Sequence, residues 1–151
     1  MRKPKVGIIV GSKTDIPVVE KAQAILKDFG IDAEITVASA HRNPDKVDQY
    51  LADAEEKFDC IIAAAGMAAA LPGVVAARTS LPVIGVPIHS TALSGHDSLF
   101  SIVQMPPGVP VATVAIDGGK NAGILAAEIL ALRYPDVKEK LIEFKKSLAH
   151  S

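Results

Sequence analysis

The chain alternates short apolar runs with longer segments of helical periodicity, and this alternation limits it to a small group of folds. The apolar runs predict strands over residues 6–10, 33–37, 60–64, 83–86 and 111–116. The longer segments predict helices over residues 16–29, 44–57, 68–78, 94–103, 121–133 and 136–148. Strands that are apolar almost throughout and alternate with helices are typical of a parallel sheet covered on both faces.

Right-handed crossovers then favour a doubly wound, flavodoxin-like sheet with the strand order 2-1-3-4-5. We therefore predict an α/β protein with three α/β/α layers around a five-stranded parallel sheet. A length of 151 residues lies within the usual range of one domain, about 100–200 residues. We expect a single domain over residues 1–151, closed by a C-terminal helix at about 136–148.

Charge and cysteine content narrow the functional classes. Sixteen basic and seventeen acidic side chains give a net charge of −1, so no overall field attracts nucleic acid or an anionic membrane. The longest apolar stretch, residues 60–77, is interrupted by Gly66 and Pro72 and does not predict a membrane span. The single Cys60 excludes an internal disulfide, and its apolar neighbours predict a buried thiol. We expect a cytoplasmic enzyme or binding domain.

The loop after the first strand, residues 11–15, combines glycine, hydroxyl side chains and the start of a helix. Free backbone N–H groups and the helix dipole favour an anion of the size of phosphate there. Ser12 and Thr14 are the candidate phosphate contacts. The alternative is structural, with Thr14 or Asp15 only capping the helix. The loop has no Walker or Gly-x-Gly-x-x-Gly fingerprint, so it is not a standard nucleotide motif.

The loop after the second strand, residues 39–44, places an imidazole beside a guanidinium. Loops at the carboxyl ends of parallel strands line the usual ligand crevice of such folds. His41 is the candidate general acid and base, because imidazole exchanges protons near neutral pH. Arg42 is the candidate partner of a phosphate, because a guanidinium donates two parallel hydrogen bonds.

Convergence of these two loops would assemble a site for a sugar phosphate. Ser12, Thr14 and Arg42 would then hold one phosphate, which leaves the Asp15 carboxylate for ribose hydroxyls. His89 ends the fourth strand and approaches the same crevice, so it is a weaker catalytic candidate. The remaining histidines are predicted to be solvated, at a helix start and in the C-terminal tail: His96 and His150.

The segment after the third strand, residues 67–73, has almost no polar side chains. Its small residues allow close backbone approach and a dry pocket for a labile intermediate, although simple helix packing explains the alanines equally well. Residues 105–110 are a candidate lid. No histidine, cysteine or carboxylate pair has metal-ligand spacing, so no metal is expected. Tyr50 and Tyr134 lie outside the predicted crevice loops, which disfavours a non-enzymatic, flavin-binding flavodoxin-like domain.

Six segments, taken in order, resemble the N5-carboxyaminoimidazole ribonucleotide mutases of purine biosynthesis. They are Gly11-Ser12-Lys13-Thr14-Asp15, Ser39-Ala40-His41-Arg42-Asn43-Pro44, Ala69-Ala70-Leu71-Pro72-Gly73, Gly85-Val86-Pro87, and residues 92–99 and 101–106. The resemblance covers nearly the whole chain. It implies a flavodoxin-like homo-octamer without a metal or organic cofactor. It also implies a reaction that moves a carboxylate from N5 to C4 and gives 4-carboxy-5-aminoimidazole ribonucleotide.

The resemblance further implies roles for individual residues. It assigns the 5′-phosphate to Ser12, Thr14, Ser39 and Arg42, the ribose to Asp15, and the general acid and base to His41. Further substrate contacts are implied at Ala40, Gly66, Ala69, Ala70 and Leu71. CO2 is implied as a trapped intermediate. The substrate is a small ribonucleotide, which a separate ATP-dependent synthetase is able to supply.

Two positions depart from the pattern of the mutases. The family usually has histidine before Leu-Pro-Gly, where this chain has Ala70, and a small residue at the position of Met67. The related direct carboxylases, which combine the unsubstituted ribonucleotide with free CO2, typically lack that histidine. A direct carboxylase is therefore the alternative to a mutase, and His89 and His96 are the candidates to replace the missing imidazole.

Overall fold

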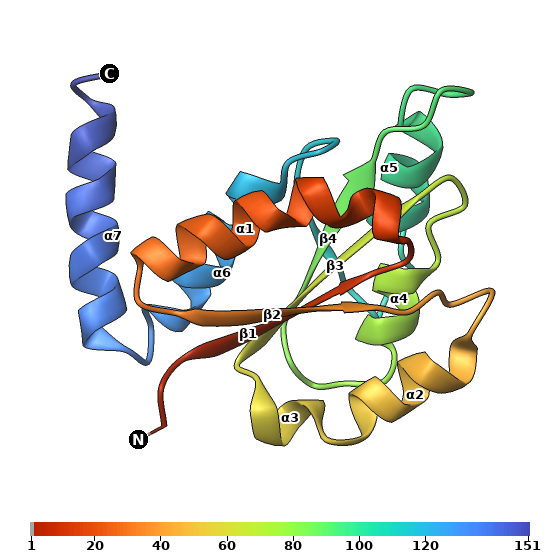
Figure 1. The fold of residues 1–151 in the computed structure, drawn as a ribbon, viewed down its shortest axis with the longest axis horizontal. Helices are drawn as coiled ribbons and strands as arrows, with labels where there is room; N and C mark the ends of the chain where they lie inside the picture. The colour runs from red at the N-terminus through yellow and green to blue at the C-terminus, as the bar shows by residue number, and fades with distance from the viewer. Residues whose placement is uncertain (1) are drawn as a thin grey trace.

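The computed structural model describes residues 2–151 and has a central sheet of five parallel strands (Figure 1). The strands are β1 (Lys5–Val10), β2 (Asp32–Val37), β3 (Cys60–Gly66), β4 (Val83–Ile88) and β5 (Ala112–Thr113). Their spatial order, β2-β1-β3-β4-β5, is flavodoxin-like and confirms the predicted fold class. Ile8 is buried in the core on one face of the sheet and Ile9 in the core on the other, as a sheet covered on both faces requires.

Helices cover both faces of the sheet (Figure 1). One core lies under α1 (Ile16–Asp28) and α6 (Gly119–Leu130). The other lies under α2 (Pro44–Ala52), α3 (Ala54–Lys57), α4 (Leu71–Ala76) and α5 (His96–Val103). The last helix, α7 (Pro135–Leu148), confirms the predicted C-terminal helix. Its Val137 and Leu141 are buried in the first core, and the rings of Phe144 and Phe29 meet edge to face at a centroid distance of 5.4 Å.

The alanines of α6 are buried within this chain. Gly119 and Gly123 bring the helix against α1 so closely that an added Cβ would lie 1.9 Å from the Val18 carbonyl oxygen or 2.5 Å from a methyl group of Ile25. The neighbouring Ala122 is fully buried for the same reason. Small residues in α6 therefore serve contact between helices of one subunit.

The fifth strand is much shorter than the predicted 111–116, and Pro87 explains why. Residues Ile84 and Gly85 of β4 pair with β5, but the next position that faces this neighbour is Pro87, which has no N–H to donate. Its carbonyl oxygen still accepts a hydrogen bond of 2.8 Å from the backbone N–H of Asp117. The strand therefore ends at Thr113: the Val114 N–H still donates to the Gly85 carbonyl at 3.2 Å, and the next backbone bond to β4 is the one from Asp117.

Two predicted helices are also shorter than expected. The segment 44–57 divides at Asp53, which leaves the helical conformation (φ −124°) and separates α2 from α3. Aspartate competes with helical hydrogen bonding, so it favours such boundaries. The segment 68–78 forms a helix only from Leu71, because Pro72 fits the first turn of a helix and not its interior.

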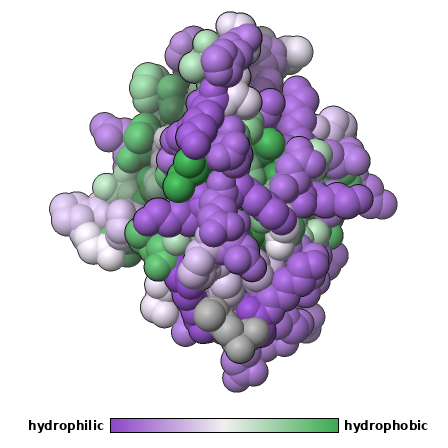
Figure 2. Space-filling view, turned by 90° about the vertical axis from the view of Figure 1, so that its left-hand side faces the viewer, coloured by the Kyte–Doolittle hydropathy of each residue, from purple (hydrophilic) through white to green (hydrophobic). Residues whose placement is uncertain are grey.

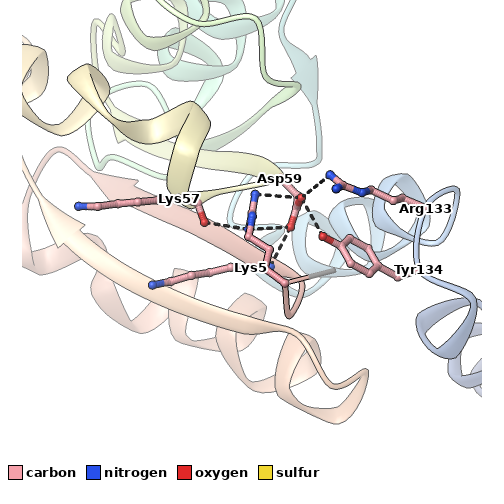
Figure 3. Close-up of polar contacts among 6 residues, drawn as sticks. Lys5, Lys57, Asp59, Arg133 and Tyr134 are labelled. Carbon is pink, nitrogen blue, oxygen red and sulfur yellow. Dashed lines mark hydrogen bonds and ion pairs between the residues drawn. The ribbon is translucent and has the colours of Figure 1, made fainter.

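A cluster around Asp59 ties the amino end of the sheet to the last two helices (Figure 3). Its carboxylate accepts hydrogen bonds from the backbone N–H of Lys5, at 3.0 Å, and from the hydroxyl of Tyr134, at 3.1 Å. The guanidinium groups of Arg2 and Arg133 pair with the same carboxylate at 3.2 and 3.5 Å. The Asp59 side chain is 8% exposed, so one buried acidic side chain joins residues 2–5 to residues 133–134.

The face that carries α7 is mainly hydrophilic, with small isolated apolar areas (Figure 2). In Figure 1 this helix stands at the left, at the amino end of the strands, whereas the strand arrows run toward the opposite side. No helix within residues 2–151 combines the length and apolar character needed to cross a membrane.

Candidate active site

A cavity of about 580 Å³ opens at the carboxyl end of the sheet. Its walls are the segments at the ends of β1, β2, β3 and β4, which meet where β1 lies between β2 and β3. The residues predicted to contact the substrate, together with His41 and the weaker candidate His89, all line it: Ser12, Thr14, Asp15, Ser39, Ala40, His41, Arg42, Gly66, Ala69, Ala70, Leu71 and His89. The structure thus brings these residues together, and their chemical roles stay predictions.

The guanidinium of Arg42 links the first two loops. Its Nη2 donates a hydrogen bond of 2.6 Å to the carbonyl oxygen of Gly11. Its Nε and its backbone N–H both donate to the hydroxyl oxygen of Ser39, at 3.3 and 3.1 Å. Within the same loop, the Asn43 backbone N–H donates to the Ser39 carbonyl at 3.0 Å. These bonds hold Arg42 beside the end of β1, so the convergence expected of the two loops is present.

The hydroxyl groups of the first loop also form a local network. A short 3-10 helix over Lys13–Asp15 precedes α1, and the Ser12 side chain caps it by accepting the Thr14 N–H at 3.3 Å. The hydroxyl oxygens of Ser12 and Thr14 lie 3.0 Å apart. Neither Thr14 nor Asp15 caps α1, because the side chain at its N-cap, Asp15, makes no capping bond. The structural alternative, in which Thr14 or Asp15 caps the helix, was therefore wrong, because the capping side chain is that of Ser12 and it caps the short 3-10 helix.

Asp15 is the most buried polar group of the site, with 7% of the residue exposed. Burial raises the pKa of its carboxyl group, and the nearby negative charge of Asp117 acts in the same direction. A 3.5 Å hydrogen bond from the Thr14 hydroxyl and the positive charge of Arg42 oppose this shift in pKa. A carboxylate held in this way is a ready acceptor for hydroxyl protons of a ligand.

His41 lies on the exposed part of the second loop, next to Arg42, and its residue lines the same cavity. An imidazole in this position has access to solvent protons and to a ligand at once. The site thus places an imidazole and a guanidinium in adjacent residues, and these residue types are suited to general acid and base chemistry on a bound phosphate ester.

The wall formed by residues 65–71 carries no polar side chain. Ala69 and Leu71 are buried, while Met67 is 66% exposed at the cavity. Met67 has a φ of 57°, a left-handed conformation in which glycine is favoured over other residues. The backbone of the turn after β3 is thus suited to glycine. In this chain the position is occupied by Met67, whose side chain is exposed to solvent.

The cavity also includes Gly11, Met67, Ala68 and His89, which the sequence placed in the crevice loops without a substrate contact. Ala65, Ile88 and Ser90 were missed, and β3 and β4 each run two residues further than predicted, to Gly66 and Ile88. Asp117 was missed entirely, although it bonds to the end of β4 and influences Asp15. The Asp-Gly-Gly sequence after the fifth apolar run was the signal of a turn there.

Two parts of the chain with predicted roles at the site, residues 105–110 and His96, lie outside the cavity. Residues 105–110 do not line the cavity, so the predicted lid is wrong for this segment. Met105 instead packs against Gly73 of α4, where an added Cβ would come within 2.9 Å of its sulfur. His96 starts α5 outside the cavity, and its Nδ1 lies 3.0 Å from the Leu93 carbonyl oxygen. It does not replace an imidazole at Ala70.

Residues 5–151 match the family model described as AIR carboxylase. An N5-carboxyaminoimidazole ribonucleotide mutase of Thermotoga maritima is 59% identical over 146 residues, which cover 96% of this chain and 85% of that protein. The mutase of Pyrococcus abyssi is 58% identical over 146 residues, covering 96% of this chain and 84% of that protein. A crystal structure of Treponema denticola PurE superposes with a TM-score of 0.89 at 32% identity, covering 98% of this chain and 93% of that one.

Proposed function

Because the chain belongs to the AIR carboxylase family, we propose that it is an N5-carboxyaminoimidazole ribonucleotide mutase of de novo purine biosynthesis. The reaction is an isomerisation that moves the carboxylate from N5 to C4 and gives 4-carboxy-5-aminoimidazole ribonucleotide. The observation that carries this proposal is the meeting of Arg42, Asp15 and His41 at one cavity, one wall of which, residues 65–71, is apolar.

The phosphate end of the ligand is assigned to Ser12, Thr14, Ser39 and Arg42. The Ser39 oxygen already accepts two hydrogen bonds from Arg42, so its own proton is free to be donated to a phosphate oxygen. The guanidinium adds positive charge at the same point. The ribose then lies beside Asp15, whose buried carboxylate accepts hydrogen bonds from sugar hydroxyls.

His41 serves as acid first and as base second. In its protonated form it donates a proton to N5 while the bond between N5 and the carboxyl carbon breaks, which releases CO2 and leaves an amine. The ring carbon C4 then attacks CO2 and becomes bonded to both hydrogen and carboxylate. The neutral imidazole removes that hydrogen as a proton, so the ring regains aromaticity and His41 returns to its starting state.

Trapped CO2 requires a closed and dry surrounding. Gly66, Ala69, Ala70 and Leu71 offer an apolar wall without competing nucleophiles, and Ala40 forms part of the opposite wall. Escape of CO2 would turn the isomerisation into a loss of carboxylate. The apolar wall is therefore as important to the outcome as the titratable groups.

A direct carboxylase that uses free CO2 is the second candidate function, and Ala70 is the observation that favours it. The segment that ends β3 contributes no imidazole to the cavity, unlike the usual mutase pattern. To separate the two functions, the purified protein is given the N5-carboxylated ribonucleotide in one assay. In a parallel assay it receives the unsubstituted ribonucleotide with bicarbonate. Fast turnover in the first assay supports the mutase, and turnover in the second alone rejects it.

We further propose that the protein works in the cytoplasm as a homo-octamer, beside a separate ATP-dependent synthetase that supplies the N5-carboxylated substrate. Exposed apolar side chains support self-association: Leu93 in the turn after β4, and Phe100 and Val103 on α5, are each at least 45% exposed. Sedimentation equilibrium of the purified protein tests the octamer directly.

A further inference from the structure

We propose that His89 binds the migrating carboxylate, at the end of the cavity opposite the phosphate clamp. This assignment rests on the mutase function proposed above and adds a residue to it. The imidazole donates an N–H to a carboxylate oxygen of the substrate, and then of the product. The carboxyl carbon thereby stays near one donor while its bond moves from N5 to C4.

The distribution of polar groups in the cavity leads to this assignment. The loops after β1 and β2 supply the hydroxyls, the Asp15 carboxylate and the Arg42 guanidinium. The segments that end β3 and β4 supply residues 65–71, Ile88, His89 and Ser90, of which the last two alone have polar side chains. The Ser90 hydroxyl lies 3.4 Å from both oxygens of Asp97 and donates to that carboxylate. Within the described cavity lining, His89 is therefore the remaining side-chain donor of this half.

The backbone of His89 and of the two residues before it is held by three neighbouring groups. Its N–H donates to a carboxylate oxygen of Asp117 at 2.9 Å, and the Asp117 N–H returns a bond of 2.8 Å to the Pro87 carbonyl. The buried Ser98 hydroxyl donates to the Ile88 carbonyl at 2.8 Å. These contacts involve only backbone atoms of residues 87–89, so they locate the Cα of His89 and leave its ring to the cavity. A binding residue on a rigid support loses little entropy when a ligand arrives.

The chemistry of the ligand fits an imidazole better than the alternatives at this end of the site. A carboxylate accepts hydrogen bonds only, and either neutral tautomer of histidine offers one N–H. The acidic groups nearby, Asp117 and Asp97, are already engaged by the His89 backbone and by Ser90. Their negative charges disfavour a ligand carboxylate that has no donor of its own, and His89 supplies a donor at this end of the cavity.

The test compares two ligands that differ only in the carboxylate. Isothermal titration measures binding of 4-carboxy-5-aminoimidazole ribonucleotide and of 5-aminoimidazole ribonucleotide to the unaltered protein and to His89→Ala. Loss of a hydrogen bond to a charged group predicts a Kd for the carboxylated ligand about tenfold higher. The Kd for the uncarboxylated ligand stays within about twofold, because the phosphate clamp is intact. His89→Gln keeps an N–H donor and recovers most of the lost affinity.

His96→Ala is the matched control, since this histidine lies outside the cavity and its removal leaves both affinities unchanged. Equal weakening of both ligands by His89→Ala, or no change in either, overturns the assignment. If the unaltered protein binds neither ribonucleotide, the proposed function fails together with it. If the unaltered protein binds both ribonucleotides and His89→Ala binds each of them with the same affinity as the unaltered protein, only the His89 assignment fails.

Discussion

The Nη2 of Arg42 donates a hydrogen bond to the carbonyl oxygen of Gly11 over 2.6 Å, and this contact joins the ends of two neighbouring strands. The two residues are 31 positions apart, so the contact depends on the fold that brings these strand ends together. The clamp proposed for the phosphate is therefore assembled by the fold itself. Preorganisation of this kind reduces the entropy lost when a ligand binds.

Replacement of Arg42 tests the clamp. We expect Arg42→Ala to raise the KM for the ribonucleotide by about 10- to 100-fold, because charge-assisted hydrogen bonds to phosphate are lost. We expect Arg42→Lys to recover only part of this, since an ammonium keeps the charge without the planar fork. Steady-state kinetics measure both variants. An unchanged KM in Arg42→Ala contradicts the phosphate assignment.

Replacement of His41 tests the proton transfers. His41→Asn retains the size and polarity of the side chain but cannot exchange a proton near neutral pH, so we expect kcat to fall by about 100- to 10,000-fold. Ribonucleotide affinity, measured by titration, should change little because the phosphate and ribose contacts remain. Full activity in this variant would show that another group moves the proton.

We expect the buried carboxylate of Asp15 to lower the stability of the folded protein while it contributes to ribonucleotide binding. Burial raises the pKa of the Asp15 carboxyl group in the folded state. The native protein therefore keeps the carboxyl proton up to a higher pH than the unfolded chain does. Stability therefore falls as pH rises from the unfolded pKa through the folded pKa of this group. We expect Asp15→Asn to raise the Tm at pH 7 and to weaken ribonucleotide binding.

The pH dependence supplies the control for Asp15→Asn. Below the unfolded pKa of aspartate, about 3.9, both states are protonated and the gain in Tm over the unaltered protein should shrink. Calorimetric scans at acidic and neutral pH measure this difference. A gain that does not depend on pH would assign the effect to packing instead of charge.

The sequence was sufficient to predict which loops meet, because the order of parallel strands decides which strand ends are neighbours. It therefore led to Ser12, Asp15, His41 and Arg42 as members of one cavity. It was insufficient for the end of β4. Pro87 ends the pairing with β5 and brings Asp117 to the backbone of His89, and no local pattern near residue 117 reports that contact.

The predicted boundaries of the helix at residues 68–78 were wrong for a related reason. The apolar periodicity of residues 68–78 was real, but Met67 turns the chain with a positive φ and Pro72 restricts the helix to a start at Leu71. Such effects depend on single residues and not on a repeated pattern. The wall of the cavity at Ala70 is a consequence, since that residue lies just before the helix and not within it.

Within the Asp59 cluster, we expect the buried carboxylate to contribute more to stability than its exposed partner Arg133 does (Figure 3). Asp59→Ala leaves the N–H of Lys5 and the hydroxyl of Tyr134 without their acceptor, so we expect a loss of about 2–4 kcal/mol in the free energy of unfolding. Arg133→Ala removes only an exposed partner of the same acid, and we expect a loss of at most about 1 kcal/mol. Urea unfolding measures both, and similar losses in the two variants would contradict this ranking.

Cys60 offers a test of burial at the start of β3. The residue is fully buried, and burial raises the pKa of its thiol to about 12. An unfolded thiol ionises near pH 8.5, so between these values the native state holds a proton that the unfolded state has lost. Stability contributed by the neutral thiol is therefore fully present below about pH 8.5 and declines as pH rises toward 12.

The decline from this one group approaches about 1.4 kcal/mol for each pH unit above 8.5. Cys60→Ala removes the titration, although it lowers stability at every pH through lost packing. We therefore expect the difference in unfolding free energy between the two proteins, measured in urea, to narrow from pH 8 to pH 10. A thiol-specific reagent should label the native protein only as fast as it unfolds, because the reactive species is the thiolate. Rapid labelling of the folded protein at pH 8, or a difference that stays constant with pH, would show that Cys60 is accessible to solvent.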